Sequence, residues 1–379
     1  MRILRLTKII VLIFSALCLL KSSGLVSQEL KDPSVREVKP ITIGMILPLS
    51  GPLAFFGQAY VQAYELAIAA RPELAKLLKV RCEDSAYNPQ RAISAFNLLT
   101  TVAKVDVVFS FGGPMLNALA PLAEARKVPF YAAESEKADC EGRAFCVLFR
   151  NEQREWGEAT WYALRKRGYK RIGIVKNQNQ FMNTFVSAII DAKRPDESVT
   201  ILVDAGPDTV DMRTEVLRLR DVSVDALGVY LLPATHRGFI SAFRGLPKRP
   251  PLFGVEQLFE QENNRGYEDV VAGALVFAPW ASAEYRNYFE SKYGHSGGFF
   301  YTPAVYDFFN LVGDVIKTSP AVRGLDFIAR MRFSGTRTGA SGEYFVKISE
   351  KGVTSYSFPI AVYRAASSIV VDDVYHAPR

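Results

Sequence analysis

The stretch "ITIGMILPLSGPLAFFGQAY", residues 41–60, changes its periodicity halfway along. It begins as an apolar run typical of a strand, and after Ser-Gly-Pro it continues with side chains that share one helical face: Tyr60, Tyr64, Ala67 and Ile68. A strand joined to a helix by a tight turn is the repeating unit of an α/β protein. Helix N-termini in such folds lie beyond the carboxyl ends of the strands, so this turn, with Ser50, is a candidate site for an anionic group.

The same alternation of strand and helix recurs along the chain. Further strands are predicted at 79–84, 105–113 and 128–135, and a second set starts with "KRIGIVKN" at residue 170. The segment "VDVVFSFGG" has almost no polar alternation, which is typical of a strand covered by helices on both faces. Because one core rarely supports a chain of this length, the pattern predicts two α/β lobes with parallel-rich sheets.

Residues 1–27 have the layout of a secretory signal peptide: basic residues, the apolar run Ile9–Leu20, then small residues. The run is too short to span a bilayer, which needs ~20 apolar residues. Leu17 precedes Cys18, where a lipidated cysteine usually follows Gly, Ala or Ser, so we expect no lipid anchor. Removing the four basic residues of this segment changes the net charge from +7 to 7 − 4 = +3, which gives no basis for nucleic-acid binding.

Three cysteines follow the signal segment. Cys140 and Cys146, in "EKADCEGRAFC", could close a small disulfide loop in an oxidising compartment, and Cys82 in the strand-like "KVRCED" is interpreted as a buried, inert thiol. The chain has no Cys/His spacing typical of a metal site, no Gly-x-Ser-x-Gly and no His-Glu-x-x-His. We therefore expect neither an enzyme nor a bound cofactor.

Several segments, in their order and separation, resemble the type I periplasmic solute-binding proteins of ABC transporters, in particular the branched-chain amino acid-binding (leucine-binding) family. They are "ITIGMILPLSGPLAFFGQ", "EDSAYNPQRAISAFNLLTTVAKVDVVFSFGG", "LAEARKVPFYAAES", "YKRIGIVKNQNQF" and "PLFGVEQ". The resemblance runs from about Pro40 to about Tyr363. It implies an α/β fold of two Rossmann-like lobes that enclose a ligand and are joined by three crossings, near Arg150, Phe277 and Thr336.

These crossings give the expected lobe boundaries. The first lobe comprises residues 40–150 and 278–336, and the second comprises residues 151–277 and 337–379. The terminal segment "GEYFVKISEKGVTSYSFPIAVYR" alternates like a β-hairpin and is assigned mostly to the second lobe.

The resemblance also implies a set of ligand-binding positions: Phe56, Gly112, Gly113, Glu134, Ser135, Phe181, Glu256 and Tyr301. Phe56 and Phe181 would line the pocket, although both could be ordinary packing residues. Glu256 would pair with a ligand ammonium group or, alternatively, form an ion pair between lobes. Gly113 has no hydroxyl for a ligand carboxylate, and Glu134 is either a ligand contact or a solvated loop residue. An amine, an amide, or a hydroxylated or aromatic acid therefore remains open beside an aliphatic amino acid.

The expected function is capture without chemistry. The resemblance implies a periplasmic monomer that binds a small polar molecule between its lobes and delivers it to the permease subunits of an ABC transporter. The alternative is a ligand-sensing or envelope-regulatory protein of the same fold that is not coupled to transport.

Overall fold

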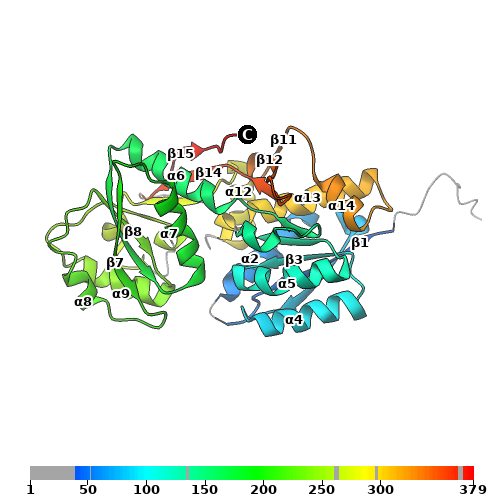
Figure 1. The fold of residues 1–379 in the computed structure, drawn as a ribbon, viewed down its shortest axis with the longest axis horizontal. Coiled ribbons are helices and arrows are strands. Elements are labelled where there is room, and N and C mark those ends of the chain that lie inside the picture. The colour runs from blue at the N-terminus through cyan, green and yellow to red at the C-terminus, as the bar shows by residue number, and fades with distance from the viewer. Residues whose placement is uncertain (1–38, 52, 134–135, 260–263, 295–297, 366–369) are drawn as a thin grey trace, which may run out of the picture. The chain divides into compact units, whose positions relative to one another are not determined.

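The computed structural model describes residues 39–379, except 52, 134–135, 260–263, 295–297 and 366–369. The described strands form two sheets (Figure 1). One has eight strands in the order β11-β12-β13-β5-β4-β3-β1-β2, and the other has seven in the order β15-β14-β10-β9-β8-β6-β7. The predicted α/β fold with two parallel-rich sheets is confirmed, whereas the predicted signal peptide lies outside the described residues.

The first sheet is parallel through its first five strands and ends in an antiparallel ribbon. Its strands are β1 (Ile41–Leu47), β2 (Leu78–Asp84), β3 (Val107–Phe111), β4 (Phe130–Ala133), β5 (Cys146–Leu148), β11 (Thr336–Gly339), β12 (Gly342–Ile348) and β13 (Thr354–Ser357). The associated helices are α2 (Ala54–Ala70), α3 (Leu74–Leu77), α4 (Pro89–Asn97), α5 (Gly113–Arg126), α13 (Pro303–Thr318) and α14 (Gly324–Met331). Every residue of β3 is buried, as expected for a strand covered on both faces.

The second sheet has a parallel centre and an antiparallel edge. Its strands are β6 (Arg171–Asn177), β7 (Ser198–Ala205), β8 (Ala226–Tyr230), β9 (Leu252–Gly254), β10 (Leu275–Pro279), β14 (Ile360–Arg364) and β15 (Val370–Tyr375). Its associated α-helices are α6 (Gln153–Lys166), α7 (Gln180–Ala192), α8 (Arg213–Leu217), α9 (Pro233–Phe243) and α11 (Glu268–Val271), and α12 (Ala283–Tyr293) follows its strand β10. Two buried clusters of apolar side chains fill this part of the molecule.

The chain crosses between the sheets three times in the described residues. The first crossing follows β5 near Arg150, as expected, and the second follows β10 at Trp280 and Ala281. The third lies at Phe358–Pro359, between β13 and β14, and not near Thr336. The assignment of residues 337–357 to the second lobe is therefore wrong, because β12 and β13 belong to the first sheet, where β13 pairs with β5.

Hydrogen bonds join the three crossings to one another. The side-chain amide of Asn151, which is 1 % exposed, donates to the Phe358 carbonyl over 2.7 Å and to the Glu155 carboxylate over 2.6 Å. The backbone N–H of Trp280 donates to the Pro359 carbonyl over 3.0 Å. The first and third crossings are thus joined through Asn151, and the second and third through Trp280.

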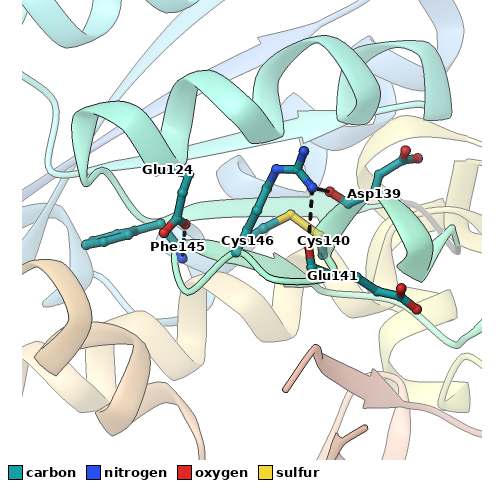
Figure 2. Close-up of a disulfide and its surroundings, with 7 residues drawn as sticks. Glu124, Asp139, Cys140, Glu141, Phe145 and Cys146 are labelled. Carbon is teal, nitrogen blue, oxygen red and sulfur yellow. Dashed lines mark hydrogen bonds between the residues drawn. A yellow bond between two sulfur atoms is a disulfide. The ribbon is translucent and has the colours of Figure 1, made fainter. Parts of the chain in front are cut away.

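The two cysteines of the "EKADCEGRAFC" segment, Cys140 and Cys146, form a disulfide with a Cα–Cα distance of 5.2 Å (Figure 2). The loop that it closes is held at both sides. The Arg143 guanidinium donates to the Asp139 carbonyl over 2.7 Å, and the Glu124 carboxylate on α5 accepts from the Phe145 N–H over 3.0 Å.

The thiol of Cys82 differs from the expectation, because it is exposed and not buried. Cys82 lies on β2, an edge strand of the first sheet, which among the described strands pairs with β1 alone. A short apolar-rich segment does not reveal whether its strand will be central or at an edge. In the described part of the chain, no helix is long and apolar enough to cross a membrane.

Candidate functional site

Phe56 on α2 lies at the centre of an aromatic cluster formed by both lobes. Its side chain is 4 % exposed, and its ring stacks on Phe111 with a centroid distance of 5.0 Å. Tyr301 approaches it edge-on at 4.6 Å, and Phe181 from α7 of the second lobe lies at 6.4 Å. The structure thus brings together Phe56, Phe181 and Tyr301 of the predicted site, although their role in binding stays a prediction.

A first pocket opens beside this cluster. Its volume is about 400 Å³, including space open to solvent. The lining residues come from both lobes: Leu53, Phe55, Phe56, Tyr87, Phe111, Asn179, Phe181, Met182, Leu232 and Pro233. The Asn179 side chain caps α7 by accepting from the Phe181 N–H over 2.9 Å, which fixes the first helical turn beneath the ring. This apolar lining suits the body of a small molecule.

A second pocket lies against the crossings. Its volume is about 430 Å³, again including space open to solvent. It is lined by Tyr60, Ala133, Phe149, Arg150, Asn151, Pro279, Tyr301, Ala304, Val305 and Phe358. Arg150 carries the only positive charge among these described lining residues. Its guanidinium carbon lies 5.3 Å from the centre of the Trp156 ring, a cation–π contact.

The two carboxylates that follow Arg150 in sequence form ion pairs with lysines from other parts of the chain. Glu152 accepts from the Lys137 ammonium over 3.0 Å, and Glu155 accepts from the Lys347 ammonium over 2.5 Å. The Nε of Arg150 is buried and has no hydrogen-bond partner among the described residues. The sequence analysis placed a crossing here but did not identify this arginine as part of the site.

The opening Ser-Gly-Pro turn is occupied by a carboxylate of the chain itself. Asp84, at the end of β2, accepts from the backbone N–H of Leu49 over 2.8 Å, from that of Ser50 over 3.2 Å and from the Ser50 hydroxyl over 2.5 Å. Burial alone would raise the pKa of Asp84, but the Ser50 hydroxyl and the amides of Ala86 and Leu49 lower it to about 2. The Ser50 amide and hydroxyl thus have an acceptor within the chain, and a role of Ser50 in ligand binding stays a prediction.

The glycines after β3 have a steric role. Gly112 adopts φ 100°, and a Cβ there would lie 2.6 Å from a ring carbon of Tyr87, so a side chain at this position would be strained and would collide. Gly113 begins α5 and is buried. Neither glycine lines the two pockets, although Tyr87 lines the first.

The predicted site includes two acidic residues, Glu134 and Glu256. Glu134 and Ser135 lie outside the described residues. Their neighbour Glu136 accepts from the Thr184 hydroxyl on α7 over 3.1 Å, a contact between lobes. Glu256 lies just after β9, and its side chain is 3 % exposed. It lines neither pocket. Burial of Tyr230 raises the pKa of that tyrosine, and the charge of Glu256 raises it further. A role of Glu256 in ligand binding stays a prediction.

The comparison with protein families matches residues 40–365 to the family described as Periplasmic binding protein. The chain belongs to this family. Members of the Periplasmic binding protein family bind solutes and do not transform them, which confirms that the chain is not an enzyme. No curated protein matches the chain.

Solved structures of similar fold include three solute-binding proteins. One, from Rhodopseudomonas palustris in complex with 3,4-dihydroxybenzoic acid, has 18% identity, a TM-score of 0.75 and coverage of 90% of this chain and 98% of its own. The leucine-binding protein LivK of Thermotoga maritima has 18% identity, a TM-score of 0.75 and coverage of 89% and 99%. LivJ of Streptococcus pneumoniae, in complex with isoleucine, has 15% identity, a TM-score of 0.72 and coverage of 89% and 99%.

Proposed function

We propose that this periplasmic binding protein captures a small polar solute between its lobes and delivers it to the permease of an ABC transporter. The solute is an amino acid or a related amide or carboxylate, with an aliphatic or aromatic body. The observation that carries the proposal is the first pocket, which both lobes line with apolar side chains. A few polar groups beside such a lining orient a ligand, while burial of its apolar body supplies affinity.

The solved relatives support this range of solutes. Isoleucine and 3,4-dihydroxybenzoic acid, the molecules bound by two of them, are both small carboxylates with an apolar body. They differ in one respect that matters for the site, because only isoleucine carries an ammonium group. The ligand of this protein is therefore to be sought in both classes.

Capture proceeds through closure of the lobes. Phe56 belongs to the first lobe, and its neighbour Phe181 belongs to the second. The hydrogen bond between Thr184 and Glu136 also joins the two lobes. A ligand that touches both lobes gains contacts only when they approach, so it favours the closed state by its differential affinity.

A thermal-shift screen of purified, ligand-stripped protein tests the binding step. Amino acids, aromatic acids and their amides are the panel, and a ligand at about 100 times its dissociation constant stabilises the protein by about 2.7 kcal/mol. The shift is expected to shrink in Phe181→Ala and to persist in Phe289→Ala, a control in which a buried Phe outside the pockets is truncated. A panel without any shift would contradict solute binding.

Cross-linking in membranes tests the delivery step. Permease subunits captured only when the ligand is present support transport. Capture of a sensor kinase or a cell-wall enzyme instead would support the alternative of a ligand-sensing or envelope-regulatory protein.

A further inference from the structure

We propose that the Arg150 guanidinium binds the carboxylate of the ligand in the second pocket, and that the ligand is an aromatic carboxylate without an ammonium group. This inference rests on the proposed function, and it specifies the solute class and the residue that recognises it. It places the anionic end of the ligand at the crossings, away from the turn at the end of β1. The two pockets adjoin, because the ring of Tyr301, which lines the second, lies 4.6 Å from the ring of Phe56, which lines the first.

The first step of the argument is that the turn after β1 is not available. Asp84 accepts hydrogen bonds from the N–H groups of Leu49 and Ser50 and from the Ser50 hydroxyl. A ligand carboxylate there would displace a carboxylate that is already hydrogen-bonded, and the two negative charges would repel each other. The donors of Leu49 and Ser50 are therefore already paired with an anion of the chain itself.

The second step is the charge of Arg150. Glu152 and Glu155, the two carboxylates that follow it in sequence, are paired with Lys137 and Lys347. The Arg150 side chain is half-buried, and its Nε has no partner among the described residues. A desolvated donor without a partner is costly, and a guanidinium binds a carboxylate through two parallel hydrogen bonds. An anionic ligand group in the second pocket supplies the carboxylate partner that this guanidinium lacks among the described residues.

The third step is the lining around Arg150. Four aromatic side chains line the second pocket: Tyr60, Phe149, Tyr301 and Phe358. Among the described residues that line either pocket, none is Asp or Glu. An α-amino acid would bring its ammonium group beside described lining residues that offer it no carboxylate, whereas an aromatic acid would bury only its ring.

The experiment compares carboxylates with uncharged analogues. Benzoate, 4-hydroxybenzoate, phenylacetate and 3-phenylpropionate are titrated calorimetrically against refolded, ligand-stripped protein, each beside its amide, and phenylalanine is the ammonium-bearing partner of 3-phenylpropionate. At least one carboxylate is expected to bind about 100-fold more tightly than its amide. Phenylalanine is expected to bind more weakly than 3-phenylpropionate. Equal affinities for every carboxylate and its amide would overturn the inference without any variant.

The variants then assign the effect to one side chain. Arg150→Met is expected to weaken the preferred carboxylate by about 100-fold while changing the affinity of its amide by less than about threefold. Arg150→Lys should retain part of the preference, because it keeps the charge without the fork of donors. Arg332→Met is the matched control, since Arg332 is also half-buried with an unpartnered Nε but lines neither pocket.

The outcomes separate this inference from the proposed function. Amino acids that bind while the aromatic acids do not, or a preferred carboxylate unaffected by Arg150→Met, would overturn the role of Arg150 and leave solute binding intact. No binding by any compound, amino acids included, would contradict the proposed function together with the inference. If Arg150→Met fails to fold, the carboxylate-to-amide ratio of the unmodified protein and the Arg150→Lys variant decide.

Discussion

His236 on α9 gives the protein a predictable sensitivity to acid. Its side chain is fully buried, and its Nε2 lies 3.0 Å from the Asn264 amide oxygen. Its Nδ1 is buried without a hydrogen-bond partner in the described residues. Burial lowers the pKa of His236 to about 4, although the hydrogen bond to Asn264 acts in the opposite direction.

The sign and size of the effect follow from this pKa. The unfolded chain, in which the histidine pKa is near 6.5, binds more protons than the folded protein between about pH 6.5 and pH 4. The contribution of the neutral, buried His236 to the free energy of unfolding is therefore present above about pH 6.5 and is lost as the pH falls toward 4. The contribution of His236 amounts to about 2.5 kcal/mol between about pH 7.5 and pH 4.5.

Urea unfolding of the unmodified protein and of His236→Phe at both pH values measures this contribution. The loss of unfolding free energy on acidification is expected to be about 2.5 kcal/mol smaller in the variant, because Phe has no proton to bind. His376→Phe is the control, since it makes the same substitution at an exposed histidine. Equal acid sensitivity in the unmodified protein and in His236→Phe would refute the reasoning.

Three further changes test other parts of the structure, each by urea unfolding. Phe56→Ala should lower the free energy of unfolding by about 3–5 kcal/mol because it leaves a cavity in the aromatic cluster, and no change would show that the cluster is loosely packed. Asp84→Ala should cost about 1–2 kcal/mol near neutral pH by leaving the turn donors unpaired; the difference should fade as the pH falls toward 2, where Asp84 protonates, and a constant difference would contradict the ionised state. The double change Cys140→Ser and Cys146→Ser should cost about 2 kcal/mol, whereas equal stability would mean that the loop is ordered without the disulfide.

The fold could be predicted where local patterns decide it. Strand, turn and helix alternate within short windows, and the caps are visible in the sequence: Asn88 caps α4 and Pro89 follows it at the first helical position. Local patterns could not predict which sheet the antiparallel strands β12 and β13 join. β13 pairs with β5 through Thr354 and Val147, residues far apart in sequence, and an alternating pattern is the same whichever sheet the strand joins.

The candidate site, too, could be predicted only in part from the sequence. Phe56 and Phe181 were identifiable through the resemblance to the solute-binding family, and the two lobes bring these positions together. Arg150 directly precedes the charged run "NEQRE", so the sequence alone indicates one of several solvent-exposed charges. Among the described residues it forms no ion pair, because Lys137 and Lys347, from other parts of the chain, pair with the neighbouring carboxylates of Glu152 and Glu155.

Asp84 had a detectable signal. An acidic residue that ends the strand beside β1 lies at the same sheet edge as the turn after β1, so its carboxylate can reach that turn. A turn that offers N–H donors and an acid at the same sheet edge are therefore candidate partners for each other.

The third crossing at Phe358–Pro359 has a consequence for the order in which the chain can fold. The first sheet receives its last strands from Thr336–Ser357, and the second receives its own from Ile360–Tyr375. During synthesis, therefore, neither lobe can be completed until nearly the whole chain has been made, although domains usually fold one after another from the N-terminus. A chain with this topology stays incomplete until its end is free, which is compatible with passing through a membrane before it folds.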